Sequence, residues 1–317
     1  MTHSVLPMRR KGCLFMTDRE YIDDFCCSIR EKGSSDNTVD AYHRDILRLY
    51  SFLSERNISF ADADEVCMSE YKEELVGEGL SESSVDRVIS SARSFYKYLV
   101  EMNITDKNPA KSIHSSKGQR KNGIDVLSNS DIEKLLSAPD YSDPKGLRDK
   151  AMLEVLYSTG LKVSEITALK LSDVNLSLGC VKTAGNGKTK KERVILLYPI
   201  AVKFLSLYIE KGRRVFASMS DSGDADGFLF LNTSGAALTR QGFWKILKHY
   251  AREAGLGDRI TPISLRHSFA AHLIENGADI RDIKEVLGHV NLSSTMVYED
   301  YIKSKIASSY LKFHPRA

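Results

Sequence analysis

The 317-residue sequence lacks any apolar run near the ~20 residues that a membrane-spanning helix needs. It also lacks a secretory signal, and we interpret residues 1–16 as a disordered lead-in. Its five cysteines are odd in number and form no CxxC pair, which argues against a disulfide framework and a zinc site. These absences predict a cytoplasmic protein with no membrane partner.

The usual signatures of metal-dependent nucleases are missing as well. We find no clustered Asp/Glu pair, no HExxH and no Walker motif. The net charge is only +3 and the pI about 8.4. Bulk charge therefore permits DNA binding without indicating it, and the placement of Lys and Arg has to be considered instead. The length is sufficient for two domains with separate cores.

Helical periodicity dominates the first third of the chain. Apolar residues recur at helical spacing over 39–53 and 85–99, and weaker patterns cover 17–32 and 64–77. They predict a small helical bundle over residues 17–112. Its polar faces carry basic residues that are solvated surface if taken singly and candidate phosphate contacts if taken as a set. These residues are Arg44, Arg48, Arg87, Arg93 and Lys97.

A polar, basic and Gly-containing linker over 113–123 separates this bundle from a second domain over 124–301. There we expect a helix that ends at Gly160 and two short strands, 180–183 and 193–197. Gly277 and Gly288 are expected helix ends. The fold class predicted is mainly α, with a small β-hairpin in the second domain.

The second domain also contains the groups needed to break a phosphodiester without a metal: a nucleophile, positive charge for the nonbridging oxygens, and an acid for the leaving oxygen. Arg266 is followed after 23 residues by His289, and His289 after 9 residues by Tyr298. Upstream lie the segments Thr159-Gly160-Leu161-Lys162-Val163-Ser164-Glu165-Ile166 and Gly187-Lys188-Thr189-Lys190-Lys191-Glu192-Arg193.

In order and spacing these blocks resemble the tyrosine recombinase (phage integrase) family, which cuts and rejoins DNA through a phosphotyrosine. The resemblance implies that Tyr298 is the nucleophile and that Arg266 and Lys162 hold the nonbridging oxygens. It implies Lys188 as the general acid and His289 as an aid to proton transfer at the tyrosine. Glu165 is either a buttress that holds a cation or His289, or plain helix surface.

Two positions depart from the family pattern. Lys162 stands where the family usually has Arg, which keeps the charge but loses the bidentate fork. Ile263 stands where it usually has the His of HxxR, and it cannot donate a hydrogen bond. Losing one transition-state donor typically costs on the order of 10²–10³ in rate. The site is therefore either adjusted or impaired.

Several residues compete for these roles. Tyr301 lies one turn after Tyr298, but only Tyr298 keeps the spacing from His289. Lys190 and Lys191 are rivals of Lys188, which is favoured because it precedes Arg193 by five residues. His267, beside Arg266, is interpreted as structural. Arg240 and Lys245 are further candidate DNA contacts on a helix that also carries Trp244.

The resemblance further implies a clamp of two domains around duplex DNA, with a tail over 302–317 that docks on a neighbouring protomer or folds back on its own domain. We expect double-stranded DNA with inverted-repeat core sites as substrate, a tetramer on two sites or a paired homologous recombinase, and no cofactor. The compact form resembles Xer-type recombinases, with dimer resolution and mobile-element integration or excision both open. A DNA-binding accessory protein with little catalysis and a relaxing enzyme like type IB topoisomerases are the alternatives.

Overall fold

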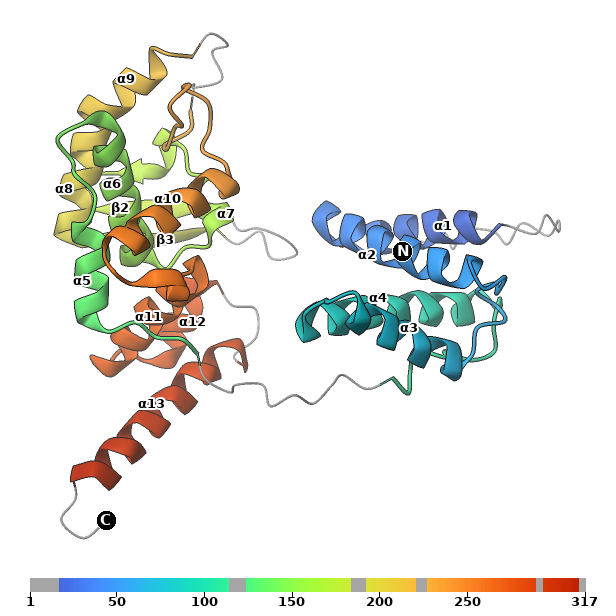
Figure 1. The fold of residues 1–317 in the computed structure, drawn as a ribbon. Coiled ribbons are helices and arrows are strands. Elements are labelled where there is room, and N and C mark those ends of the chain that lie inside the picture. The colour runs from blue at the N-terminus through green and yellow to red at the C-terminus, as the bar shows by residue number, and fades with distance from the viewer. Residues whose placement is uncertain (1–16, 114–123, 184–191, 221–226, 289–292, 314–317) are drawn as a thin grey trace, which may run out of the picture. The chain divides into compact units, whose positions relative to one another are not determined.

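The computed structural model describes residues 17–113, 124–183, 192–220, 227–288 and 293–313, and it divides the chain into two compact units, Met1–Lys121 and Asn122–Ala317 (Figure 1). Lys188 and His289, both expected in the site, lie outside the described residues. Within the described part, no helix is long and apolar enough to cross a membrane.

The first unit is a bundle of helices, as predicted. The helices are α1 (Asp18–Glu31), α2 (Asp36–Ser54), α3 (Glu65–Gly77) and α4 (Glu82–Glu101). Each begins at a Thr, Ser or Asp whose side chain accepts a hydrogen bond from a backbone N–H of the first turn, which satisfies an otherwise unpaired donor. The apolar faces meet around Phe25, Phe60 and Phe95, whose rings pack edge to face.

The second unit is mixed, with helices around a small antiparallel sheet. Its first half contains α5 (Asn129–Ser137), α6 (Pro144–Thr159), α7 (Val163–Ile166), η1 (Leu171–Asp173), β1 (Val174–Asn175), β2 (Cys180–Thr183) and β3 (Arg193–Leu196). Its second half contains α8 (Pro199–Leu207), η2 (Tyr208–Gly212), α9 (Arg213–Ala217), α10 (Arg240–Glu253), η3 (Gly257–Arg259), α11 (Pro262–Glu275), α12 (Ile280–Leu287) and α13 (Ser293–Phe313). The sheet order is β1-β2-β3.

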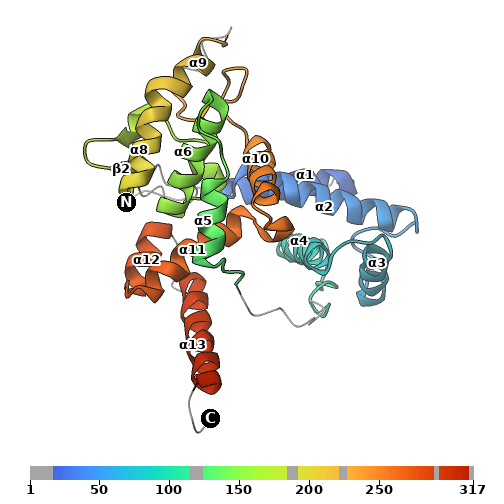
Figure 2. The ribbon, with the colours of Figure 1, turned by 60° about the vertical axis from the view of Figure 1, so that its left-hand side comes forward.

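Helix α6 is the central element of the second unit, since nearly all of its residues are buried and it packs on both α8 and α11. It ends at Gly160, whose φ of 60° lies in the left-handed region that glycine adopts without cost. At one end of the unit α11, α12 and α13 pack together, as Figures 1 and 2 both show. This corner brings Arg266 close to Tyr298.

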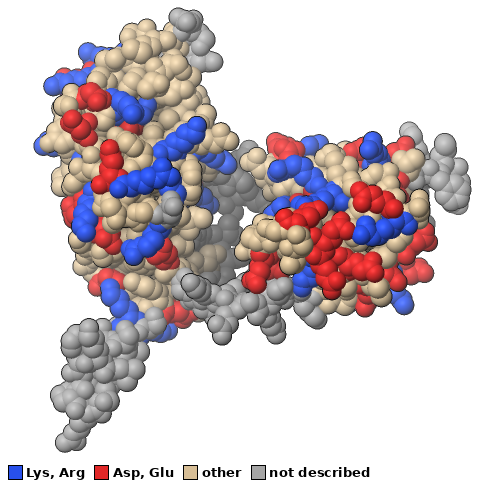
Figure 3. Space-filling view, viewed as in Figure 1, with Lys and Arg blue, Asp and Glu red and all other residues tan. Residues whose placement is uncertain are grey.

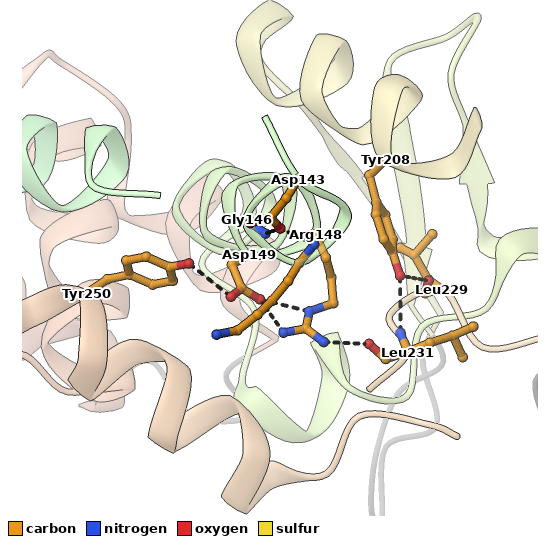
Figure 4. A network of polar contacts seen from close by, with 9 residues as sticks. Asp143, Gly146, Arg148, Asp149, Tyr208, Leu229, Leu231 and Tyr250 are labelled. Atoms are coloured by element: carbon orange, nitrogen blue, oxygen red, sulfur yellow. Dashed lines mark hydrogen bonds and ion pairs between the residues drawn. The ribbon is translucent and has the colours of Figure 1, made fainter. Parts of the chain in front are cut away.

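A buried polar network fixes α6 to its surroundings (Figure 4). Arg148 pairs with Asp149 at 2.7 Å and donates to the Leu231 carbonyl at 3.0 Å, while the Tyr250 hydroxyl donates to Asp149 at 3.1 Å. The network ties α6 to α10 and to the segment around Leu231. A buried charge left without its partner is costly, so this network makes the position of α6 specific.

The predicted helix end at Gly160 and the helix end at Gly288 are confirmed, as are the strand cores β2 and β3. Helix α11 ends at Glu275, with Gly277 two residues later at a φ of 95°. The two-residue strand β1 was not predicted. It is too short to show a periodicity, and it exists because it pairs with β2.

Candidate active site

Arg266 lies on α11 and is held at the point where α6 and α12 end. Its Nη1 donates to the Gly160 carbonyl at 2.5 Å and its Nη2 to the Leu287 carbonyl at 2.6 Å. Both carbonyls belong to helix C-termini, which carry partial negative charge and leave their last carbonyls unpaired. Burial lowers the pKa of Arg266, and the negative charge of Glu165 opposes this. The guanidinium is thus a buried cation in a fixed orientation.

A second arginine, Arg193 at the start of β3, connects two other parts of the site. Its Nη2 donates to Glu165 on α7 at 2.5 Å, and its Nη1 donates to the Val286 carbonyl on α12 at 2.6 Å. Glu165 also accepts from the backbone N–H of Lys162 at 2.9 Å. Of the two readings of Glu165, the structure favours the buttress, because the carboxylate is buried and binds a cation.

Gly288 ends α12 in the left-handed region, with a φ of 65°. A Cβ built on Gly288 would lie 2.5 Å from Nη1 of Arg193, so a side chain has no room here. The guanidinium of Arg193 therefore lies directly against the backbone of Gly288. Arg193 and Glu165 together set the position at which the chain leaves α12.

Tyr298 is in the second turn of α13 and is only 1% exposed. Its ring packs among Phe269, Ile283 and Leu287. Its Oη lies 3.0 Å from Nδ1 of His267. Burial raises the pKa of Tyr298, and the nearby positive charge of Arg266 lowers it. The phenol is therefore protonated at neutral pH and lies within the field of a buried cation.

The two positions that depart from the family pattern are both solvent-exposed. Lys162 immediately precedes α7, and its side chain is exposed. Ile263 is 66% exposed in the first turn of α11, one turn before Arg266 and His267. Among the residues that the structure describes, the isoleucine therefore has no packing role that would account for it.

Known proteins resemble this chain over nearly its whole length. Residues 125–304 match the model of the phage integrase family, and residues 22–103 match the N-terminal SAM-like domain of phage integrases. The chain belongs to the phage integrase (tyrosine recombinase) family. The predicted family and enzyme class, a tyrosine site-specific recombinase, are therefore confirmed, and the alternative of a catalytically impaired accessory protein is not favoured.

Among the relatives, the tyrosine recombinase XerD of Listeria innocua is 43% identical over 307 residues, which cover 94% of this chain and 99% of that protein. The tyrosine recombinase XerD of Staphylococcus epidermidis is 40% identical, with 90% and 95% covered. The fold resembles the XerH site-specific recombinase bound to a palindromic difH substrate, with a TM-score of 0.72, 22% identity and 92% and 84% of the two chains covered. It also resembles the Tn1549 transposon integrase in complex with circular-intermediate DNA, with a TM-score of 0.73, 17% identity and coverage of 92% and 99%.

The basic residues predicted as DNA contacts of this recombinase differ in how they are engaged. Arg48 pairs with Glu78, and Arg87 pairs with the buried Asp45. Arg93 donates to the Ala110 and Ile113 carbonyls and so anchors the segment after α4. These three arginines make contacts within the first unit, and the sequence periodicity did not indicate those contacts.

The remaining candidates are more open to solvent. Lys97 is exposed, and its one ion pair within the described residues is a long one, 3.9 Å, to Glu101. Arg44 is exposed and donates to a carbonyl of its own helix. Arg240 and Lys245 are exposed on α10 of the second unit. In Figure 3, the visible face of the first unit mixes acidic and basic side chains. That face is therefore not a uniformly basic surface.

Two residues of the site were not assigned to it from the sequence. Arg193 served only as a reference point for choosing Lys188, and His267 was interpreted as structural. The signal for Arg193 was its place at the start of a strand two residues from the basic loop. For His267 it was the helical spacing that sets it one turn from Ile263.

Proposed function

We propose that this recombinase cleaves DNA with Tyr298 as nucleophile and becomes linked to the 3′ phosphate through a phosphotyrosine. The observation that carries the assignment is the position of the Tyr298 hydroxyl, within the field of the buried Arg266 and in contact with His267. Positive charge beside the attacking oxygen stabilises the phenolate that attacks and the charge that develops on the phosphate. Tyr301, one turn later, is less buried.

The other residues take the roles that the family pattern implies. Arg266 and Lys162 hold the nonbridging oxygens, and Lys188 protonates the departing 5′ oxygen. His289 assists proton transfer, while Glu165 keeps Arg193 in place. Arg266 is well suited to its role because two carbonyls fix its guanidinium before substrate arrives, so little reorganisation is needed.

The reaction conserves the energy of the DNA bond. The freed 5′ hydroxyl of a partner strand attacks the phosphotyrosine, so the strands exchange without ATP. We infer a tetramer on two inverted-repeat sites and a Holliday junction, with domains 17–112 and 124–301 on either side of the duplex. The tail over 302–317 would exchange between protomers, and the protein would be associated with the nucleoid. The relatives named XerD and the likeness to DNA-bound recombinases support this proposal.

Covalent trapping tests the proposal directly. The protein is incubated with fragmented DNA of the source organism and denatured in SDS, and the protein-linked fragments are recovered and sequenced. Tyr298→Phe is the test variant and Tyr301→Phe the matched control one turn away. Adducts at one inverted-repeat site that persist in Tyr301→Phe and vanish in Tyr298→Phe would establish the nucleophile and the target.

The opposite outcomes are equally clear. Adducts that survive in Tyr298→Phe and vanish in Tyr301→Phe would transfer the role to Tyr301. Site-specific binding without any adduct would point to an accessory DNA-binding protein. Relaxation of plasmid without site preference would point to a relaxing enzyme of the topoisomerase type.

A further inference from the structure

His267 makes a polar contact with the proposed nucleophile. It lies on α11 next to Arg266, and its Nδ1 is 3.0 Å from the Tyr298 Oη on α13. The two rings are tilted at 60° with centroids 5.5 Å apart, so the contact is made through the polar atoms and not by stacking. His267 also follows Ile263 by one helical turn, so an imidazole is present on this side of α11 although position 263 has none.

The surroundings of His267 keep its ring neutral. Burial and the adjacent positive charge of Arg266 lower the pKa of His267, and the negative charge of Asp125, before α5, opposes them. Burial raises the pKa of Tyr298, so the phenol retains its proton. A neutral imidazole has one unprotonated ring nitrogen, and a phenol is a hydrogen-bond donor. With the ring proton on Nε2, Nδ1 of His267 is the acceptor and the Tyr298 hydroxyl is the donor, at a hydrogen-bond distance of 3.0 Å.

We propose that His267, and not His289, is the group that accepts the Tyr298 proton during cleavage and returns it during rejoining. This inference rests on the proposed role of Tyr298. As the Oη–P bond forms, the Oη–H bond breaks and the proton moves to Nδ1 of His267. The P–O5′ bond then breaks, and the O5′ takes a proton from Lys188. In rejoining, the imidazolium protonates the departing tyrosine oxygen, and Arg266 beside it favours this release.

The same helix carries a second pair of similar geometry that has no part in the site. The Tyr157 hydroxyl lies 2.8 Å from Nδ1 of His272, and Nε2 of His272 lies 2.9 Å from the Leu127 carbonyl. A carbonyl only accepts, so Nε2 carries the proton and Nδ1 accepts from Tyr157. This pair holds α11 against α6 and the segment before α5, and it supplies a matched control.

The test uses a duplex that carries the trapped site, nicked so that cleavage is irreversible, with either oxygen or sulfur at the bridging 5′ position. His267→Asn keeps a hydrogen-bonding atom at the Nδ1 position but cannot accept the proton. His267→Ala removes the hydrogen-bonding atom as well. His272→Asn is the control. We expect both His267 variants to bind the duplex like the wild type and to form the adduct at least about a hundredfold more slowly, as expected for a lost general base. His272→Asn should retain the wild-type rate.

Two further readouts separate proton transfer from simple positioning. Sulfur leaves without protonation, so the sulfur substrate should rescue Lys188→Ala and leave the His267→Asn defect unchanged. The wild-type rate of adduct formation should fall in acid, because a protonated His267 cannot accept the proton. The positive charge of Arg266 shifts this fall to lower pH, and the negative charge of Asp125 opposes that shift. The fall should be absent in His267→Asn. Wild-type cleavage by His267→Asn would overturn the inference, as would a defect of this type in His289→Asn alone.

The inference and the proposed function fail in different ways. An adduct that persists in Tyr298→Phe removes the nucleophile and the inference with it. An adduct that depends on Tyr298 but forms at the wild-type rate in His267→Asn leaves the proposed function intact and rejects only the role of His267.

Discussion

Arg193 and Glu165 form a buried ion pair in which Nη2 donates to Oε1 at 2.5 Å, and their side chains are only 9% and 4% exposed. The pair joins β3 to α7, and the other end of the guanidinium reaches the Val286 carbonyl on α12. Three segments that are distant in sequence thus converge on one planar cation. The pair lies against the backbone N–H of Lys162 on one side and against Gly288 at the end of α12 on the other.

Replacing Glu165 by Gln should destabilise the second unit, because Arg193 would then be buried near Arg266 without a counter-charge. Removing one partner of a buried pair typically costs about 3–5 kcal/mol. Urea unfolding followed by the fluorescence of Trp244, the single tryptophan, reports on this unit. The control is Glu192→Gln, which breaks the exposed Lys182–Glu192 pair of the same hairpin and should leave the midpoint unchanged. Equal effects of the two variants would contradict the role of the buried pair.

Replacing Gly288 by Ala should cost stability twice, through left-handed backbone strain and through a clash with Arg193. Gly255→Ala is the control, because its φ of 70° is similar and its Cβ would meet nothing within 4 Å. Left-handed strain alone costs about 1–2 kcal/mol. We expect Gly288→Ala to lose at least about 1 kcal/mol more than Gly255→Ala in the same urea assay, as a clash that forces a shift in packing does. A loss no greater than the control would show that Arg193 moves aside freely.

Restoring the family residues with Lys162→Arg and Ile263→His tests whether the site is impaired or adjusted. Both side chains are exposed, so the double variant should fold like the wild type. We expect a gain in adduct formation below about tenfold, less than the 10²–10³ that a missing transition-state donor typically costs. A gain of a hundredfold or more in single-turnover cleavage would mark the natural chain as an impaired form.

Substitutions of basic residues in the first unit should affect DNA binding differently, depending on whether the residue has a partner within the protein. Lys97→Gln and Arg44→Gln each remove an exposed charge, and each should lower the slope of log K against log salt by about 0.9 if that residue contacts a phosphate. Arg93→Gln should instead destabilise the unit, because its guanidinium anchors the Ala110 and Ile113 carbonyls. Binding titrations over a salt series, with circular dichroism of each variant, provide the measurement. An unchanged slope for both exposed variants would remove them from the interface.

The stability of the second unit should fall in acid through His272. Burial lowers the pKa of His272 below its ordinary 6.5, so the unfolded chain binds this proton more readily than the folded one. The contribution of neutral His272 to the free energy of unfolding is complete above pH about 6.5 and is lost as the pH falls toward the pKa in the folded state. The free energy of unfolding then changes by up to about 1.4 kcal/mol per pH unit. His272→Asn should reduce that slope in urea titrations from pH 7 to 5. Identical slopes in the variant and the wild type would rule out His272 as the source.

The helices of the first unit could be predicted because their apolar residues repeat with the helical period behind Ser caps, as at Ser35 and Ser81. The roles of Arg48, Arg87 and Arg93 could not, because an ion pair between helices or a contact with a distant carbonyl leaves no periodic signal. Strand β1 was not predicted either, because two residues are too few to show the alternation of a strand.

The sequence by itself determined the family, the two-domain plan and the candidate residues, which are Arg266, Lys188, His289 and Tyr298. These follow from the order and spacing of chemical groups along the chain, which do not depend on knowing the fold. Only the tertiary structure decided that Arg266 is held by the Gly160 and Leu287 carbonyls and that Glu165 binds Arg193. It alone placed His267 against Tyr298. Such contacts join residues between 21 and 106 positions apart, and they form only when α6, α7, β3, α11, α12 and α13 come together in the folded unit.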